Sequence, residues 1–192
     1  MPVWAIVLLV VLGVLILLTG IIIMWVVSVY NSLIKLKNNV EEGYSTMDVY
    51  MKKRYDLIPN FVETVKGYAK HEKEALEKVM QARYSCMSAN TPEERAKSEN
   101  MLAGTLKSLF AVTENYPDLK ANINFIELQN TLNNLELEIA NSRKYYNGCV
   151  KLLNNKIELF PSNLVARKFN FEKKPLFEII NEEEKVVPKV QF

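Results

Sequence analysis

The stretch VWAIVLLVVLGVLILLTGIIIMWVV, from Val3 to Val27, decides the fold class of this chain. Its 25 residues include no charged side chain, and 18 of them are Val, Ile or Leu. As an α-helix the run would be about 37 Å long, which exceeds the roughly 30 Å hydrocarbon core of a bilayer. Each central Val, Ile or Leu favours insertion by about 0.3–0.6 kcal/mol, and no charge opposes it. The sequence therefore predicts a transmembrane anchor over residues 1–29.

A cleaved secretory signal is the alternative interpretation of this run. Such a signal needs a basic N-terminal region, a shorter apolar core and small residues at the cleavage site. Met1–Trp4 contains no Lys or Arg, and Trp25–Tyr30 is bulky where small residues would be needed. We therefore expect an anchor that stays attached, with Trp4 near one membrane interface and Trp25 and Tyr30 near the other.

The orientation of the span follows from the basic residues beside it. Lys35 and Lys37 follow the run closely, whereas no Lys or Arg precedes it. Basic residues near a span are retained on the cytoplasmic side. The two cysteines, Cys86 and Cys149, form no CxxC motif, and we interpret them as small buried hydrophobes of a reducing compartment. The prediction is a single-pass protein with its N-terminus outside and the remainder in the cytoplasm.

Apolar residues recur at three- and four-residue steps after the span, which indicates one helix face that faces a core. The pattern begins at Leu33 and reaches Pro59, where the missing N–H group and the ring predict a kink or a restart. The same period then continues from Phe61 to about Tyr84. The sequence thus predicts a long helical region in which Pro59 is the first interruption.

The next helix has a clear start signal. Thr91 can accept hydrogen bonds from the first turn, Pro92 suits the first helical position, and Glu94 stands where it can reach back to Thr91. This pattern is typical of a capping box. The helix that it begins should end near Tyr116 and Pro117.

The longest predicted helix of the water-exposed part runs from about Asn122 to Pro161. Its apolar residues form a near-heptad stripe, as in a coiled coil. Long striped helices joined by short turns bury their stripes by antiparallel packing. The predicted fold is therefore all-α, with one N-terminal transmembrane helix, a long antiparallel helical bundle over residues 30–170 and an extended tail over 171–192. Within the bundle, 164–169 is expected to add a turn or two.

Composition and motifs argue against several classes of function. Lys and Arg number 24 and Asp and Glu 22, so no attraction to nucleic acid is expected. His71 is the single histidine, lacks the second histidine of a zinc-protease motif, and is interpreted as part of a solvated helix surface. No glycine-rich phosphate loop occurs. The chain is expected to be no enzyme and to bind no cofactor and no metal.

Arg54 is the unusual residue, because it places a charge on the apolar stripe close to Pro59. A guanidinium in such a place needs a partner, either Asp56 or a carboxylate of another helix. We favour a structural role in which this region fixes the backbone at Pro59; the alternative is a docking surface. The candidate interaction or structural residues are Arg54, Tyr55, Asp56, Pro59, Asn60, Tyr68, Tyr116, Pro117 and Asp118.

Five stretches carry a resemblance to a known family. They are YNSLIKLKNNVEEGYSTMDV (30–49), KRYDLIPNFVETVKGYAKHE (53–72), AVTENYPDLKAN (111–122), SRKYYNGCVKLLN (142–154) and FPSNLVARKFNF (160–171). With these stretches the chain closely resembles the LemA family of bacterial proteins. The resemblance implies an N-terminal transmembrane helix, an N-terminus that faces outward and a long antiparallel helical bundle. It implies no catalytic residues.

Two hypotheses of function follow. The first is a non-enzymatic scaffold or assembly factor at the bacterial inner membrane, which self-associates or recruits an unidentified protein partner. Tethering raises local concentration, so modest affinities suffice for such a role. The alternative is a membrane-stress sensor or regulator that binds a partner protein. The expected partners are the lipid bilayer, a second copy of the chain and another protein, but not nucleic acid.

Overall fold

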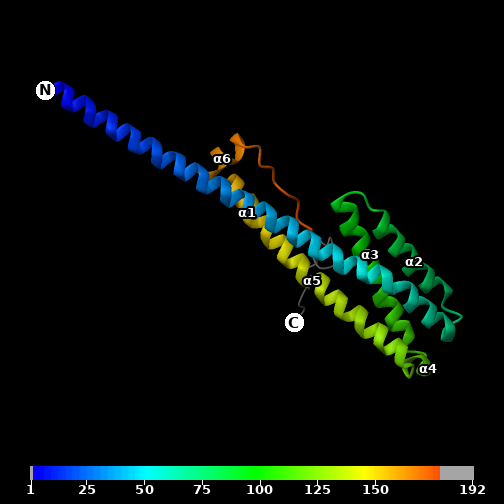
Figure 1. Cartoon of the computed structure of the whole chain (residues 1–192). Helices are drawn as coiled ribbons and strands as arrows, with labels where there is room; N and C mark the ends of the chain where they lie inside the picture. The colour runs from blue at the N-terminus through cyan, green and yellow to red at the C-terminus, as the bar shows by residue number, and fades with distance from the viewer. Residues whose placement is uncertain (1, 178–192) are drawn as a thin grey trace, which may run out of the picture. The chain divides into compact units, whose positions relative to one another are not determined.

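The computed structural model describes residues 2–177, and its regular structure in that range is entirely helical (Figure 1). An apolar N-terminal helix is followed by further helices, so the all-α prediction is confirmed. The helices are α1 (Val3–Tyr68), α2 (Lys73–Ser88), α3 (Pro92–Thr113), α4 (Pro117–Lys120), α5 (Ile123–Glu158) and α6 (Ser162–Lys168).

The contacts divide the chain into two compact units. Unit 1 consists of Met1–Glu42 and Gly148–Lys174, and unit 2 consists of Gly43–Asn147 and Pro175–Phe192. The long helices α1 and α5 each contribute one part to either unit. Two unit boundaries therefore fall inside helices, and the third lies in the non-helical segment after α6.

Unit 1 begins with the apolar run, whose side chains have no packing partner in the described chain. None of the 18 consecutive residues of highest mean hydropathy in α1 is buried. This helix is long and apolar enough to cross a membrane. Burial starts directly after the run, at Val29 and Leu33. There the ring of Tyr30 packs against Phe169 and Phe171, with centroid distances of 4.8 and 5.8 Å. In unit 1, the apolar run without packing partners is therefore followed directly by residues of α1 that pack against the segment after α5.

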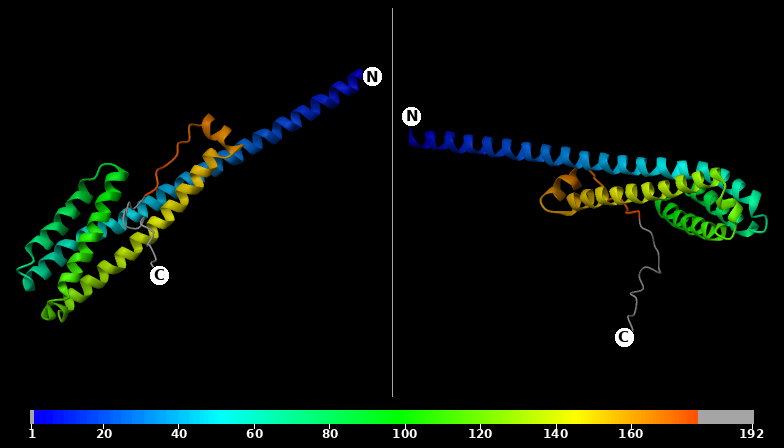
Figure 2. Two further views of the ribbon diagram at one scale, coloured as in Figure 1. Left: turned by 180° about the vertical axis from the view of Figure 1, so that it is seen from behind. Right: turned by 90° about the horizontal axis from the view of Figure 1, so that it is seen from below.

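Unit 2 packs the second part of α1 with α2, α3 and the first part of α5 (Figure 2). Its core contains a small aromatic cluster, in which the ring of Phe61 lies 5.3 Å from that of Phe110 and 5.4 Å from that of Phe125. Phe61 and Phe125 are almost fully buried. The cluster joins α1, α3 and α5, and its burial contributes much of the hydrophobic stabilisation of this unit.

The expectation of a restart at Pro59 is wrong. Helix α1 continues through Pro59 to Tyr68. Pro59 removes one backbone hydrogen bond and leaves the carbonyl of Tyr55 without its helical donor. Arg83 of α2 donates from Nε to that carbonyl at 2.7 Å, while Ile58 and Phe61 on either side are fully buried. A tertiary donor and core packing therefore keep the helix intact.

The predicted continuation of this helix to about Tyr84 is also wrong. Helix α1 ends at Tyr68, residues 69–72 form a turn, and α2 starts at Lys73. The apolar period persists across the turn because Leu76 and Val79 pack into the same core. His71 is exposed in this turn and not on a helix surface. Periodicity alone does not distinguish one helix from two that share a core.

The later boundaries agree with the prediction. The capping box forms, because Thr91 Oγ1 accepts from the Glu94 amide at 3.1 Å and the Glu94 carboxylate accepts from the Thr91 amide at 3.3 Å. Helix α5 spans nearly the predicted range, and its first turn is closed by Asn122 Oδ1, which accepts from the Phe125 amide at 3.1 Å. Helix α6 is the short segment expected after Pro161.

The described part of the tail, residues 171–177, has no regular secondary structure but is bound to α5 by asparagine side chains. In unit 1, Asn154 donates to the carbonyl of Lys174 and accepts from its amide, both at 2.9 Å. In unit 2, Asn147 makes the same pair of bonds to Phe177, at 3.0 and 2.8 Å. Each carboxamide thus replaces the backbone partner that a strand would supply. Residues 178–192 lie outside the described part.

Candidate functional site

The densest polar cluster of unit 2 surrounds Arg54. On α1 the stripe Met47, Met51, Arg54, Ile58 points into the core, and Arg54 occupies a place that an apolar residue would normally take. Arg54 is 1% exposed and is the largest of the fully buried side chains in the described chain. Burying a guanidinium costs several kcal/mol unless it is paired and hydrogen-bonded. The surroundings of this side chain therefore decide whether the unit is stable.

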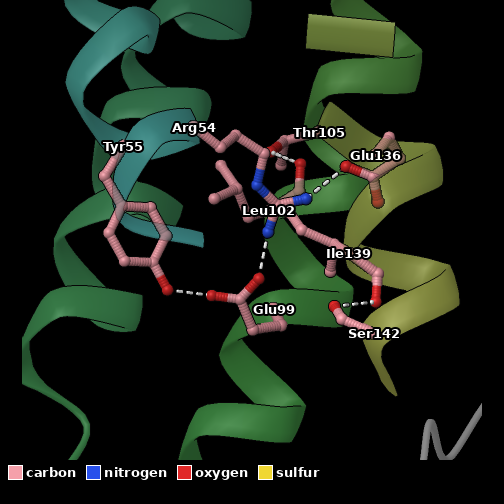
Figure 3. Close-up of polar contacts among 8 residues, drawn as sticks. All are labelled: Arg54, Tyr55, Glu99, Leu102, Thr105, Glu136, Ile139 and Ser142. Atoms are coloured by element: carbon pink, nitrogen blue, oxygen red, sulfur yellow. Dashed lines mark hydrogen bonds and ion pairs between the residues drawn. The ribbon is translucent and has the colours of Figure 1, made fainter. Parts of the chain in front are cut away.

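Two carboxylates from different helices meet the guanidinium (Figure 3). Arg54 donates from Nη2 to Glu99 of α3 and from Nη1 to Glu136 of α5. The hydroxyl of Tyr55 donates to the second oxygen of Glu99. We call Arg54, Tyr55, Glu99 and Glu136 the Arg54 cluster. It joins α1, α3 and α5 through charge-assisted hydrogen bonds.

The environment of the cluster is closed on one side and open on the other. Glu99 is 6% exposed, whereas the side chain of Glu136 is 46% exposed. The nearby hydroxyls of Thr105 and Ser142 bond to carbonyls of their own helices, so they add no polar group to the cluster (Figure 3). Arg54 Nε has no hydrogen-bond partner. Glu136 lines a surface depression of about 310 Å³, but Arg54 and Glu99 are not among its lining residues.

The other predicted residues on α1 lie outside the cluster. Asp56 and Asn60 are exposed and Pro59 is half-buried. Of the two partner alternatives for Arg54, carboxylates of other helices hold the guanidinium, and Asp56 makes no ion pair with it. The backbone carbonyl of Asn60 accepts from Thr64 Oγ1 at 2.8 Å.

The remaining predicted residues form a second group at the end of unit 2 where the α1–α2 turn and α4 lie (Figure 1). Tyr116 donates to Glu72 at 2.9 Å, and the hydroxyl of Tyr68 accepts from Asn122 at 2.8 Å. Pro117 and Asp118 are exposed in the first turn of α4. Each tyrosine thus links two connections of the bundle. The structure does not bring this group together with the Arg54 cluster.

The sequence model of the family described as "LemA family" matches residues 43–192 of this chain, which include the whole Arg54 cluster. The chain belongs to the LemA family. A relative described as "Protein LemA", from Metamycoplasma hominis, is 27% identical over 152 residues, and the match covers 77% of this chain and 68% of the relative. Among described residues of this LemA family chain, no group of three or more His, Cys, Asp or Glu side chains could hold a metal ion.

Electrostatics fix the protonation states in this part of the LemA bundle. Burial lowers the pKa of Arg54, but the charges of Glu99 and Glu136 outweigh it, so the pKa lies above its ordinary value. Burial and Glu99 raise the pKa of Tyr55, which stays a neutral donor. Burial, with a further contribution from Glu99, raises the pKa of Cys86 to about 12. These three shifts hold each group in its usual form near neutral pH, which is the reverse of what acid–base catalysis needs.

A pattern in the sequence marks one of the two partners of Arg54. Glu99 precedes Leu102, Leu106 and Leu109 at three- and four-residue steps, so it is a charge on an apolar stripe, as Arg54 is. Pairing two such residues would have identified it. Glu136 follows the buried Leu135 and lies off the stripe, and no local pattern marks it.

The Cys86 thiol should react slowly in the folded LemA chain. Its pKa of about 12 lies three units above the ordinary 9.0, which lowers the thiolate fraction about a thousandfold. In a Cys149→Ala background, we expect a disulfide reagent at pH 8 to label the native chain far more slowly than the chain in urea. Because folding favours the neutral thiol, this group lowers stability as pH rises above 9. Equal rates in both states would contradict the burial.

Proposed function

We propose that this LemA family chain is a membrane-anchored scaffold or assembly protein of the bacterial inner membrane. Its helical bundle self-associates or recruits a protein partner, and it performs no catalysis. The observation that carries the proposal is the continuity of α1, which holds 25 uncharged residues with unburied side chains and then enters the bundle as a core helix. One helix thus combines an anchor with a rigid binding module.

The anchoring part of the proposal rests on solvation. A monomeric soluble protein rarely exposes apolar patches above a few hundred Å², and an uncovered helix of 25 apolar residues exceeds that limit. Lipid would cover the run, since its length exceeds the hydrocarbon core of a bilayer. Lys35 and Lys37, which are the nearest basic residues, would then remain on the cytoplasmic side.

The binding part of the proposal rests on the role of the buried charges. In the Arg54 cluster the guanidinium, the phenol and both carboxylates make contacts between helices. Arg95 of α3 likewise reaches α1, with 2.5 Å to Asp48 and 3.3 Å to the hydroxyl of Tyr44. Such links specify which helices pack together and in which register. Because the pairing and register of the helices are held in this way, the same side chains always lie on the outer surface, where a partner can bind them.

Two outer faces of unit 2 carry exposed apolar pairs at helical spacing. Tyr84 and Met87 of α2 are exposed, and so are Ile123 and Ile126 of α5. Residues three apart lie on the same side of a helix. Either pair would serve as the centre of a contact with a second copy or with another protein. Aromatic and methionine side chains, such as those of Tyr84 and Met87, are enriched in protein–protein interfaces.

Mass measurement and cross-linking test the scaffold function. The full chain, cross-linked in intact bacterial membranes and purified in mild detergent, is expected to appear as adducts larger than one chain. A Tyr84→Ser, Met87→Ser variant and an Ile123→Ser, Ile126→Ser variant serve as a matched pair, and one of them should lose the adducts while keeping its helix content by circular dichroism. A strictly monomeric particle that carries no partner would contradict the scaffold proposal.

A further inference from the structure

The segment 159–169, which comprises the turn after α5, helix α6 and the residue after it, exposes an unusual number of large apolar side chains. Leu159, Phe160, Leu164 and Phe169 are 63%, 78%, 56% and 48% exposed. Phe160 is even more exposed than Val3, which at 77% is the most exposed large apolar residue of the N-terminal run. Single exposed apolar residues are normal on protein surfaces, but four within eleven residues mark a contact surface. We call residues 159–169 the α5–α6 turn.

The exposure is built into a well-bonded local structure. The hydroxyl of Ser162 donates to the carbonyls of Lys156 and Leu159, at 2.7 and 2.9 Å, which closes the end of α5. Helix α6 buries Val165 and Ala166 against unit 1. Around the helix axis, Leu164 lies about 100° from Val165 and about 160° from Ala166. It therefore points away from the core and stays 56% exposed. The apolar face is therefore held outward by the packing of the opposite face.

The position of the turn within unit 1 indicates what it meets. The Tyr30 ring packs against Phe169 at 4.8 Å between centroids. Tyr30 is three residues beyond Val27, or about 4.5 Å along the helix axis. The headgroup layer of a bilayer is about 5–7 Å thick on each side. With the apolar run in the bilayer, α6 therefore lies at headgroup depth, and Figures 1 and 2 show it beside α1 where that run ends.

The charges around the turn match a lipid surface. Residues 151–174 contain six Lys or Arg and two Glu. One of these acids, Glu158, is paired with Lys173 at 2.6 Å. Basic residues at the cytoplasmic surface are attracted to anionic lipids by about 1 kcal/mol each. Apolar side chains flanked by basic ones are the composition of interfacial membrane-binding segments.

We propose that the α5–α6 turn is a second membrane contact, which binds the surface of an anionic bilayer. Leu159, Phe160 and Leu164 enter the boundary between headgroups and acyl chains, and Lys156, Arg167 and Lys168 bind anionic headgroups. The inference rests on the proposed anchoring of α1. With two contacts, unit 1 is fixed in its rotation about the axis of α1, so the same side of the unit always faces the membrane.

Lipid photolabelling tests this contact. The full chain is reconstituted in vesicles of phosphatidylcholine and phosphatidylglycerol that contain a phospholipid with a diazirine on its acyl chain, and labelled peptides are mapped by mass spectrometry. We expect labels in 3–27 and in the α5–α6 turn. Leu152 is the internal control, because it is 59% exposed on α5 but lies two helical turns farther from the apolar run than Leu159 does. The turn should be labelled at least about tenfold more than Leu152, because the label stays within the acyl region.

A charge variant tests the lipid preference. Lys156→Gln, Arg167→Gln and Lys168→Gln together should lower labelling of the turn about tenfold or more in anionic vesicles, because three attractions to anionic headgroups are removed, with little change in neutral vesicles. Labelling of 3–27 should stay constant. Lys52→Gln, Lys70→Gln and Lys73→Gln, which change the net charge equally, should leave the turn labelled.

The outcomes separate this inference from the proposed function. Labels in 3–27 with no more label in the turn than at Leu152 would overturn the second contact and leave the anchor standing. Absence of label from 3–27 would overturn the anchor and the inference with it. An α5–α6 turn that excludes lipid and cross-links to a second copy would assign the surface to self-association and overturn the lipid contact.

Discussion

Three arginines in the middle of the apolar run are expected to release the chain from the membrane. Leu12→Arg and Val14→Arg point to opposite sides of α1, and Leu17→Arg lies on the same side as Val14→Arg, so both sides of the helix carry charge. Each central Arg opposes insertion by about 2.5–3.5 kcal/mol, which sums to roughly 7–10 kcal/mol. The variant keeps 15 of the 18 Val, Ile and Leu residues, which together favour insertion by about 4.5–9 kcal/mol. The arginines oppose insertion by the same amount or more, so the balance for insertion is lost.

Alkaline carbonate extraction of bacterial membranes measures this effect. The unmodified chain should stay in the pellet, and the arginine variant should appear in the supernatant or be degraded. Alanine at the same three positions is the matched control, since it shortens side chains without adding charge, and it should remain in the pellet. An arginine variant that stays in the pellet with its bundle folded would show that α1 does not hold the chain in the bilayer.

Replacing Arg54 by methionine is expected to destabilise unit 2 by about 3–5 kcal/mol, because it leaves Glu99 as a buried, uncompensated charge. Urea unfolding in mild detergent, followed by circular dichroism, measures the loss. Glu136→Gln should cost less than about 1 kcal/mol, because that side chain is half-exposed and water screens its charge. The two carboxylates of the cluster are thus expected to differ in importance.

A triple variant distinguishes pairing from the general loss of a large side chain. Arg54→Met combined with Glu99→Leu and Tyr55→Phe removes the buried charges together and leaves no phenol without its acceptor. Exchange of a complete buried ion pair for apolar residues of similar volume is often neutral or stabilising. The triple variant should therefore recover most of the stability lost by Arg54→Met. If it is no more stable than the single variant, the unpaired charge of Glu99 is not what destabilises Arg54→Met.

The features that depend on local chemistry could be predicted from the residues alone. The uncharged run from Val3 to Val27 predicts a helix that does not pack against the rest of the chain, because the core of a domain this small could not cover 25 such residues. The Thr91–Glu94 capping box forms as predicted because its partners are three residues apart. The stripe of α5 forms one long helix as predicted, because no proline interrupts it before Pro161. Arg54 was identifiable as a charge on an apolar stripe.

Which distant groups meet depends on how the helices pack. Glu99 and Glu136 are 45 and 82 residues from Arg54; the apolar stripe marks Glu99 as a candidate partner, but no local pattern marks Glu136. Helix α1 survives Pro59 because Arg83, 28 residues away from Tyr55, supplies the missing donor. The exposure of Leu164 likewise depends on which face of α6 packs inward. Local sequence sets backbone conformation through short-range hydrogen bonding and periodicity, whereas the pairing of charges and the choice of exposed faces depend on how the helices pack.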